Sequence, residues 1–224
     1  MAQLFGAAPA NDLPMVPNYN VCPTNQVHVV QAGEGGENDG ENDAESAGAR
    51  NLVSMRWGFL PHWYKCPSDG PLLINARAET LAQKPAFRAA CRARRCLIAT
   101  TGFYEWTKTP DGARLPWYIT RRDGAPVVFG AVWQQWNGGA SPINTCAIVT
   151  TSANAAMSAV HHRMPVILEP DDWALWLGEK GHGAAALMVP APEDVVAFHR
   201  VGVAVNSNRA SGPELIEEID AEGF

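Results

Sequence analysis

Short runs of β-branched and aromatic residues, each bounded by Gly, Pro or Asp, recur along the chain and limit its fold more than any other feature. Such runs are typical of strands, so we expect a core dominated by sheet. Helical patterns are fewer and cover Thr80–Arg92, Ala153–Val160 and Asp171–Leu177. The combination predicts an α+β domain. The expected strands are Val27–Gln31, Arg95–Thr101, Trp117–Thr120, Pro126–Gln134, Thr145–Thr151, Pro165–Leu168 and Arg200–Val205.

The chain of 224 residues is long enough for one large domain or two small ones. No internal repeat divides it, and its composition shifts only once, so we expect a single domain over residues 1–224. The shift is a stretch from Gly33 to Ser46 with six acidic residues and no basic one. Because Gly, Asn, Ala and Ser make up the rest of this stretch, we expect a flexible, solvated acidic loop at 33–49.

Simple features bear on location and cofactors. No apolar run approaches the length of a membrane span, and Met1–Phe5 lacks the segments of a signal peptide. We therefore expect a cytoplasmic protein with no membrane partner. The five cysteines are odd in number and include no Cys-x-x-Cys spacing, which favours reduced thiols and argues against a zinc site. We expect neither a metal nor another cofactor.

Between Thr80 and Tyr104 the chain carries five basic residues and no acidic one. Such a run suits a polyanion on one face of the molecule. It is also typical of the solvated side of a helix, and composition does not decide between the two interpretations. The five residues are Lys84, Arg88, Arg92, Arg94 and Arg95.

One candidate functional segment follows the apolar pair Leu73–Ile74. Asn75, Arg77 and Glu79 come directly after that pair and before a predicted helix. Functional side chains gather at strand ends of this kind. The alternative is structural: Glu79 and Thr80 begin the helix, and Arg77 pairs with Glu79.

Two further candidates are a carboxylate and an imidazole. Glu105 stands among three aromatic rings, where desolvation raises the pKa of a carboxyl group and suits it to general acid catalysis. Pairing of Glu105 with a nearby arginine is the competing interpretation. His161 and His162 lie between a predicted helix and a strand, and imidazole is the side chain whose ordinary pKa is closest to neutral pH.

Taken in order, these segments and several others resemble the SOS-response-associated peptidase (SRAP) family. The resemblance extends from Leu4 to Ile219, apart from the acidic stretch, and ordered motifs with consistent spacing are far more specific than any one of them. The matching segments are Tyr19–Thr24, Arg56–Pro61, Ile74–Thr80, Arg95–Ile98, Gly102–Trp106, His161–Pro165, Val205–Asn206 and Gly212–Ile216.

The resemblance implies a β pseudo-barrel with peripheral helices that recognises abasic sites in single-stranded DNA during the DNA damage (SOS) response. In the family, an N-terminal Cys supplies an amine and a thiol. The amine condenses with the sugar aldehyde to an imine, and the thiol closes that imine into a thiazolidine, which is a DNA–protein cross-link. The family name then refers to removal of the protein's own first residue.

The resemblance also implies roles for three residues at the reacting centre. Asn75 matches the amide that steadies the reacting end. Glu105 matches the acid/base beside the new ring, and His161 matches the imidazole beside the sugar. We expect these three side chains to meet at one groove near the beginning of the chain.

Four more residues match positions that hold the DNA strand. Arg77 and Arg163 match positions that hold phosphate, and Trp63 and Pro23 match the rim against which the strand and its bases lie. We therefore expect a monomer whose partner is single-stranded DNA with an abasic site.

The beginning of the chain departs from the family pattern. Family members begin Met-Cys-Gly-Arg, whereas this sequence begins Met1-Ala2-Gln3-Leu4, so the first strand is expected to be absent. If Ala2 is the mature start, its α-amine can form an imine that no thiol locks, and the cross-link is then reversible.

Two other functions stay open. Cys22 stands where the family usually has Ala, so a cysteine hydrolase using Cys22 and His161 is one alternative. A non-catalytic single-strand binding module that keeps Asn75, Glu105 and His161 only as scaffold is the other. Such a module binds intact and abasic strands equally well and with a steep salt dependence.

Overall fold

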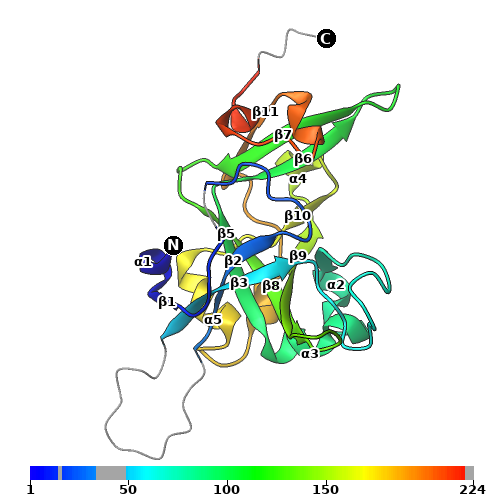
Figure 1. Cartoon of the computed structure of the whole chain (residues 1–224). Coiled ribbons are helices and arrows are strands. Elements are labelled where there is room, and N and C mark those ends of the chain that lie inside the picture. The colour runs from blue at the N-terminus through cyan, green and yellow to red at the C-terminus, as the bar shows by residue number, and fades with distance from the viewer. Residues whose placement is uncertain (15–16, 34–48, 220–224) are drawn as a thin grey trace, which may run out of the picture.

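The computed structural model describes residues 1–14, 17–33 and 49–219, and the predicted acidic loop at 33–49 falls mainly outside these ranges. Figure 1 shows two sheets, one above the other, with helices around the lower one. The strands of the larger sheet are β1 (Ala7–Pro9), β2 (Gln26–Gln31), β3 (Arg50–Trp57), β4 (Asn75–Arg77), β5 (Arg95–Thr100), β8 (Val127–Trp136), β9 (Ile143–Ser152) and β10 (Arg163–Pro165). The smaller sheet contains β6 (Phe103–Lys108), β7 (Arg114–Arg121) and β11 (Val196–Arg200).

The larger sheet closes on itself at β9. Its order is β1-β3-β2-β5-β8-β9-β10, and β9 also pairs with β3 and β4 in parallel. The central strands β5 and β8 are buried along most of their length, which explains their nearly continuous apolar sequence. The result is the expected α+β pseudo-barrel with peripheral helices.

Two clusters of buried side chains lie on opposite faces of the larger sheet. The first contains Phe59, Leu97 and Trp176 and is covered by helices. The second contains Met55, Ile98 and Phe129 and continues toward the smaller sheet, where Phe103 of β6 meets Phe129 edge-on with ring centroids 5.5 Å apart. This aromatic contact joins the two sheets.

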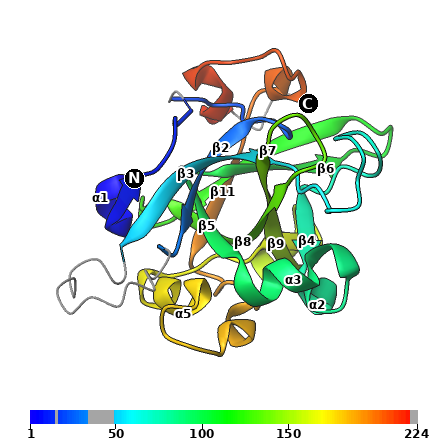
Figure 2. The same ribbon diagram turned by 60° about the horizontal axis from the view of Figure 1, so that its bottom comes forward.

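The helices are short and lie mostly on one side of the larger sheet, as Figure 2 shows for α2, α3 and α5. The α-helices are α1 (Ala2–Phe5), α2 (Ala78–Leu81), α3 (Pro85–Ala93), α4 (Ala155–Ser158) and α5 (Trp173–Leu177). The 3-10 helices are η1 (Pro170–Asp172), η2 (Ala184–Leu187), η3 (Val203–Asn206) and η4 (Pro213–Ile216). Among the described residues, no helix is long and apolar enough to span a membrane.

The single helix predicted over Thr80–Arg92 is wrong, because two helices occupy this region. Pro85 disfavours a helical conformation for the residue before it, and Lys84 is extended with φ −66° and ψ 124°. The chain therefore leaves α2 after Leu81 and begins α3 at Pro85.

Two strand predictions also need correction. The predicted strand Arg200–Val205 is in fact the end of β11 at Arg200 followed by the 3-10 helix η3. In the predicted strand Pro165–Leu168, β10 ends at Pro165, and Ile167 forms only an isolated bridge with Phe129. The sequence patterns located the apolar residues correctly but not the hydrogen-bonded ends.

Candidate functional site

Glu105 lies in β6 of the smaller sheet, opposite Trp117 of β7. Its side chain is 25% exposed to solvent. Burial raises the pKa of the Glu105 carboxyl, while the charge of His161 and a backbone hydrogen bond from Trp106 act in the opposite direction. The carboxyl group therefore retains a proton at higher pH than an exposed glutamate, as predicted from its aromatic neighbours.

His161 stands in the turn between α4 and β10, and this turn is held at both ends. Asn154 caps α4 by accepting a hydrogen bond from the backbone N–H of Met157 at 2.8 Å. The backbone N–H of His161 donates to the carbonyl of Met157 at 2.9 Å. The imidazole position is therefore fixed by the end of this short helix.

The side chains of Glu105, on β6, and His161, in the turn before β10, face each other. The distance from Glu105 Oε1 to His161 Nδ1 is 3.7 Å. The same Nδ1 lies 3.0 Å from the carbonyl oxygen and 3.2 Å from the backbone nitrogen of Arg163. A partly buried carboxyl group beside an imidazole, with both side chains still open to solvent, can exchange protons with a bound molecule.

Asn75 and Arg77 occupy the same face of β4, because alternate residues of a strand point to one side. Both are exposed, and neither side chain hydrogen bonds to another of the described residues. Arg77 pairs in register with Thr150 of β9, and Pro165 of β10 pairs with the same Thr150 from the other side. Strand register thus brings β4 and the strand after His161 to one short stretch of β9.

Arg163 is already occupied by protein groups. Its guanidinium donates to both carboxylate oxygens of Glu79, at 2.7 and 3.0 Å, and to the carbonyl oxygen of Thr150 at 2.6 Å. The partner of Glu79 is therefore Arg163 and not Arg77, whose charge acts on Glu79 more weakly. This clamp joins α2, β9 and β10.

Pro23 lies in the turn before β2. In this turn Thr24 has a φ of 76°, which is rare for a β-branched residue. The backbone N–H of Thr24 donates to the carbonyl of Trp57 at 2.7 Å, and Trp57 Nε1 donates to the carbonyl of Ile74 at 3.0 Å. Trp57 thereby connects the turn that contains Pro23 to the residue directly before Asn75.

Trp63 lies in the loop between β3 and β4 and is 47% exposed. Its ring stands edge-on to His62, with centroids 4.9 Å apart. The loop is anchored by Leu60, Tyr64 and Trp136, which form a small apolar cluster. An exposed indole on a fixed loop is available to a ligand, and this loop runs straight into Asn75.

Other predicted features lie elsewhere. Cys22 Sγ is 3.5 Å from the carbonyl oxygen of Asn20, and no hydrogen bond or ion pair joins it to His161 in the described part of the chain. The chain's first residues form α1, where Phe5 packs on Trp173 with ring centroids 4.5 Å apart. Burial lowers the pKa of His28 on β2, and the positive charge of the Met1 amino group lowers it further.

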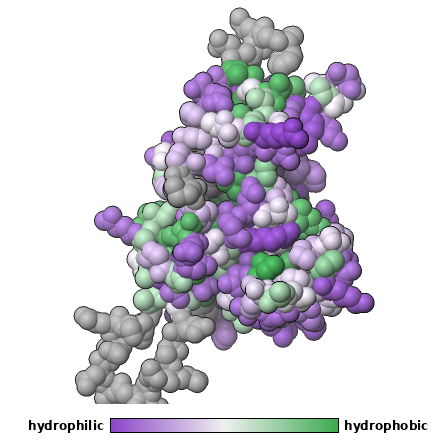
Figure 3. Space-filling view, in the orientation of Figure 1, coloured by the Kyte–Doolittle hydropathy of each residue, from purple (hydrophilic) through white to green (hydrophobic). Residues whose placement is uncertain are grey.

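The side chains of Glu105 and His161 are 25% and 32% exposed, so the pair is open to solvent. Two pockets of about 400 Å³ are lined by none of the predicted site residues, and they lie at the C-terminal end of α3 and beside Asn11 and Asn144. Figure 3 shows many hydrophilic residues on the face that includes β6, β9 and β10. No group of three or more potential metal ligands occurs within residues 1–14, 17–33 and 49–219.

The sequence patterns did not reveal several residues that build this surface. Asn154, Trp57 and Thr24 position the functional side chains through single hydrogen bonds. An Asn directly before a helix was the one available signal, since Asn is a preferred N-cap residue.

Curated proteins of similar sequence share one description. The chain is 35% identical over 205 residues to "Abasic site processing protein YoqW" of Bacillus subtilis (strain 168), covering 90% of this chain and 86% of the relative. It is 28% identical over 216 residues to "Abasic site processing protein YedK" of Escherichia coli (strain K12), covering 93% and 89%. It is also 28% identical over 234 residues to "Abasic site processing protein HMCES" of Gallus gallus, covering 91% and 67%.

Solved structures share the fold. A protein from Bordetella bronchiseptica aligns with a TM-score of 0.70 at 22% identity, over 90% of this chain and 94% of that one. A protein from Bacteroides thetaiotaomicron aligns with a TM-score of 0.67 at 24% identity, over 75% and 77%. The family model described as "SOS response associated peptidase (SRAP)" matches residues 1–208. Together with the ordered motifs and the shared fold, this match shows that the chain belongs to the SRAP family.

Proposed function

We propose that this protein recognises abasic sites in single-stranded DNA and forms a covalent cross-link with the sugar aldehyde. The observation that carries the proposal is the approach of Glu105 Oε1 to His161 Nδ1 at 3.7 Å, with both side chains partly exposed. Relatives at 28 to 35% identity are named abasic site processing proteins, which supports the same substrate.

The exposed side chains around the site suit a polymer. A single strand needs cationic groups for its phosphates and flat side chains for its bases. Arg77 is exposed beside Asn75, and Trp63 is exposed on the loop that leads into β4. In the proposal Arg77 contacts phosphate, while Trp63 and the turn with Pro23 form the rim. Arg163 contacts phosphate in the proposal only where the phosphate competes with Glu79 for its guanidinium.

The chemistry requires an amine and a proton donor. A protein amine attacks the aldehyde carbon, the carbon–oxygen π bond breaks, and a carbinolamine forms. Its hydroxyl then accepts a proton from the Glu105 carboxyl and leaves as water, which produces an imine. A thiol next to that amine closes the imine into a thiazolidine. Because burial raises the pKa of Glu105, the carboxyl group holds this proton to a higher pH than an exposed glutamate does.

Asn75 and His161 assist this step. The Asn75 amide offers both a donor and an acceptor, and it has no protein partner in the described part of the chain. In the proposal it orients the carbinolamine. The imidazole of His161 holds Glu105 toward the sugar and exchanges its proton.

Borohydride trapping on single-stranded DNA with one abasic site tests the proposal. We expect a covalent adduct with the wild-type protein, and mass spectrometry of the trapped peptide identifies the amine. Glu105→Gln and His161→Gln lower the trapping rate by about 10²–10⁴-fold, the range of general acid–base catalysis. Glu217→Gln, at an exposed position directly after η4, serves as the matched control and keeps the rate.

Failure to trap any adduct, with equal affinity for intact and abasic strands, would overturn the covalent step and leave a binding module. We also propose that the protein acts as a monomer in the cytoplasm. Size-exclusion chromatography with light scattering, at the concentration used for trapping, checks the first part.

A further inference from the structure

The outer face of α3 carries a row of cations. Lys84 precedes the helix, and Arg88 and Arg92 follow at intervals of four residues, which places all three on one side about 6 Å apart along the axis. All three are exposed. We call these three residues the α3 stripe.

The opposite face of α3 holds the helix in place. Phe87 and Ala90 are buried in the core, and the ring of Phe87 meets that of Phe59 with centroids 5.1 Å apart. The stripe is therefore presented on a helix that cannot turn its charges inward.

The α3 stripe has no acidic partner among the described residues. Arg50, Arg121 and Arg163 each form an ion pair with a carboxylate. No such pair involves the stripe, and the segment from Thr80 to Tyr104 contains no acidic residue. Most protein surfaces intersperse the two signs of charge, so an unpaired row of three cations is complementary to a polyanion.

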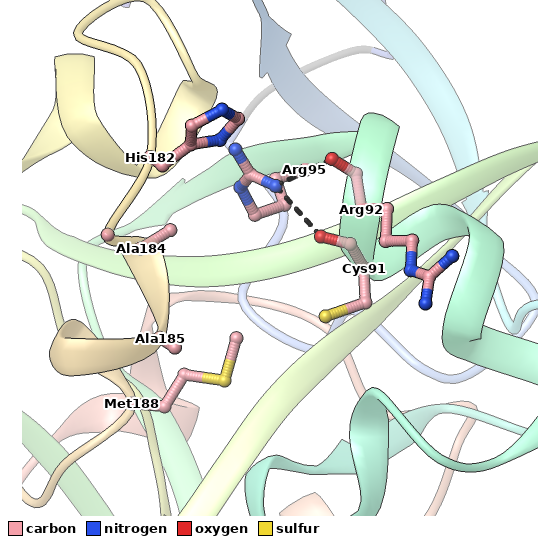
Figure 4. A pocket seen from close by; sticks show the side chains of 8 residues that line it. Cys91, Arg92, Arg95, His182, Ala184, Ala185 and Met188 are labelled. Atoms are coloured by element: carbon pink, nitrogen blue, oxygen red, sulfur yellow. Dashed lines mark hydrogen bonds between the residues drawn. The ribbon is translucent and has the colours of Figure 1, made fainter.

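At the C-terminal end of α3, a cation offsets the partial negative charge that would repel an anion. Helix ends of this kind carry partial negative charge. Here the Arg95 guanidinium donates to the carbonyl oxygens of Cys91 and Arg92, at 2.8 and 2.9 Å. Figure 4 shows Arg95 between α3 and His182, in the pocket of about 400 Å³ that Arg92 also lines. The negative end of the helix is thus covered by a cation.

The α3 stripe is continuous with the functional site along the chain. Arg77 ends β4, α2 follows at once, and Lys84 begins the stripe three residues after α2. Figure 2 shows α2 and α3 next to each other, on the same side as β4. A strand that leaves Arg77 over α2 therefore reaches Lys84 first.

We propose that the α3 stripe binds the phosphodiester backbone of the same single strand beyond the abasic site, with its far end at the pocket formed by Arg92, Arg95 and His182. This inference rests on the proposed function, because it extends the path of the DNA from Arg77. The spacing of the three cations is similar to that of successive phosphates in an extended strand. The contacts are to phosphate, so the stripe increases affinity without reading sequence.

Fluorescence anisotropy with strands of two lengths tests the stripe. One strand of about 8 nucleotides spans the site alone, and one of about 25 nucleotides also reaches the stripe. For Arg88→Gln/Arg92→Gln we expect about tenfold weaker binding of the long strand, and a log–log salt slope smaller by about 1.4. Binding of the short strand and its borohydride trapping stay unchanged.

The matched control, Lys108→Gln/Arg122→Gln, removes two exposed cations, one at the end of β6 and one directly after β7. An equal loss in this control, an equal loss on the short strand, or no loss on the long strand would each overturn the role of the stripe. If the wild-type protein traps no abasic strand while the difference between lengths persists, the proposed cross-linking fails and the stripe stands. The two ideas are thus separable.

Discussion

Substitutions in the ion pair between Arg163 and Glu79 distinguish a structural role of Arg163 from a DNA-binding role. Glu79→Gln removes the charge of the pair and keeps the shape of the side chain. Arg163→Met removes the whole guanidinium, including its hydrogen bonds to the carbonyl and hydroxyl oxygens of Thr150. The two substitutions therefore remove different numbers of contacts from the same junction.

The exposure of each partner sets the expected magnitudes. The Glu79 side chain is 50% exposed and that of Arg163 is 18% exposed. Ion pairs open to solvent contribute roughly 0.2–1 kcal/mol, so Glu79→Gln lowers the free energy of unfolding by up to about 1 kcal/mol. Arg163→Met also removes the hydrogen bonds from the charged guanidinium to the carbonyl and hydroxyl oxygens of Thr150, which adds about 1–3 kcal/mol.

Urea denaturation at pH 7 measures both values, and the double variant gives the coupling between them. We expect the double variant to be no less stable than Arg163→Met alone, because the pair is already lost there. If Glu79→Gln destabilises the protein as much as Arg163→Met, the assignment of the larger part to Thr150 is refuted.

The pH dependence of Glu79→Gln provides a second check. The hydrogen bond from Arg163 lowers the pKa of Glu79 below its ordinary value of 4.5. A carboxyl group of this kind stabilises the fold above its unfolded pKa, and the contribution disappears as pH falls through the folded pKa. The difference between wild type and Glu79→Gln should therefore vanish in acid.

DNA binding then distinguishes the two roles of Arg163. In Glu79→Gln the guanidinium loses its anionic partner, so a phosphate meets less competition there. If Arg163 contacts phosphate, Glu79→Gln binds an abasic strand more tightly and Arg163→Met binds it more weakly. If Arg163 only positions β10, Glu79→Gln leaves the affinity unchanged.

Three other substitutions address single features of the site. For Glu105→Gln, burial raises the pKa of the carboxyl above its ordinary value of 4.5, so wild type loses stability relative to the variant as pH rises from 4.5 through the folded-state pKa. Urea titrations at several pH values measure this loss. Asn154→Ala removes the cap of α4 and a donor to the buried carbonyl of Ala191, and thermal denaturation should show a loss of about 2–3 kcal/mol. Cys22→Ala should trap abasic DNA at the wild-type rate, because the thiol contacts Asn20, and a slower rate would restore the hydrolase alternative.

The sequence predicted the strands that pack most tightly. The run from Val127 to Val132 is buried on both faces of β8, so its apolar character alone identified the strand. In β3 only Leu52, Val53 and Met55 are buried, and Asn, Ser and Arg interrupt the pattern, which is why composition passed over it. The gap between α2 and α3 before Pro85 could not be predicted, because a helical pattern can continue past a proline. The effect of Pro85 on the backbone of Lys84 became clear only from the structure.

The candidate site shows a similar division. Its residues could be proposed because the motifs stand in a consistent order along the chain. Their pairing could not, since the sequence offered a nearby arginine as an equally plausible partner for Glu105. The structure favours His161, whose charge acts on Glu105 more strongly than that of Arg114. The partner of Glu79 could not be predicted either, because Arg163 lies 84 positions away along the chain.

The acid–base pair joins a strand of the smaller sheet to a turn beside the larger one, so its geometry depends on how the two sheets are held together. Glu105 belongs to the smaller sheet, while His161 enters from the turn that leads into the larger one. Phe103 lies on the same face of β6 as Glu105, and its contact with Phe129 fixes that face against β8. The chemistry of the site therefore depends on the contact between Phe103 and Phe129, two residues from the carboxylate. A small rotation of the smaller sheet against the larger one separates the Glu105 carboxyl group from the His161 imidazole, although every strand pairing stays intact.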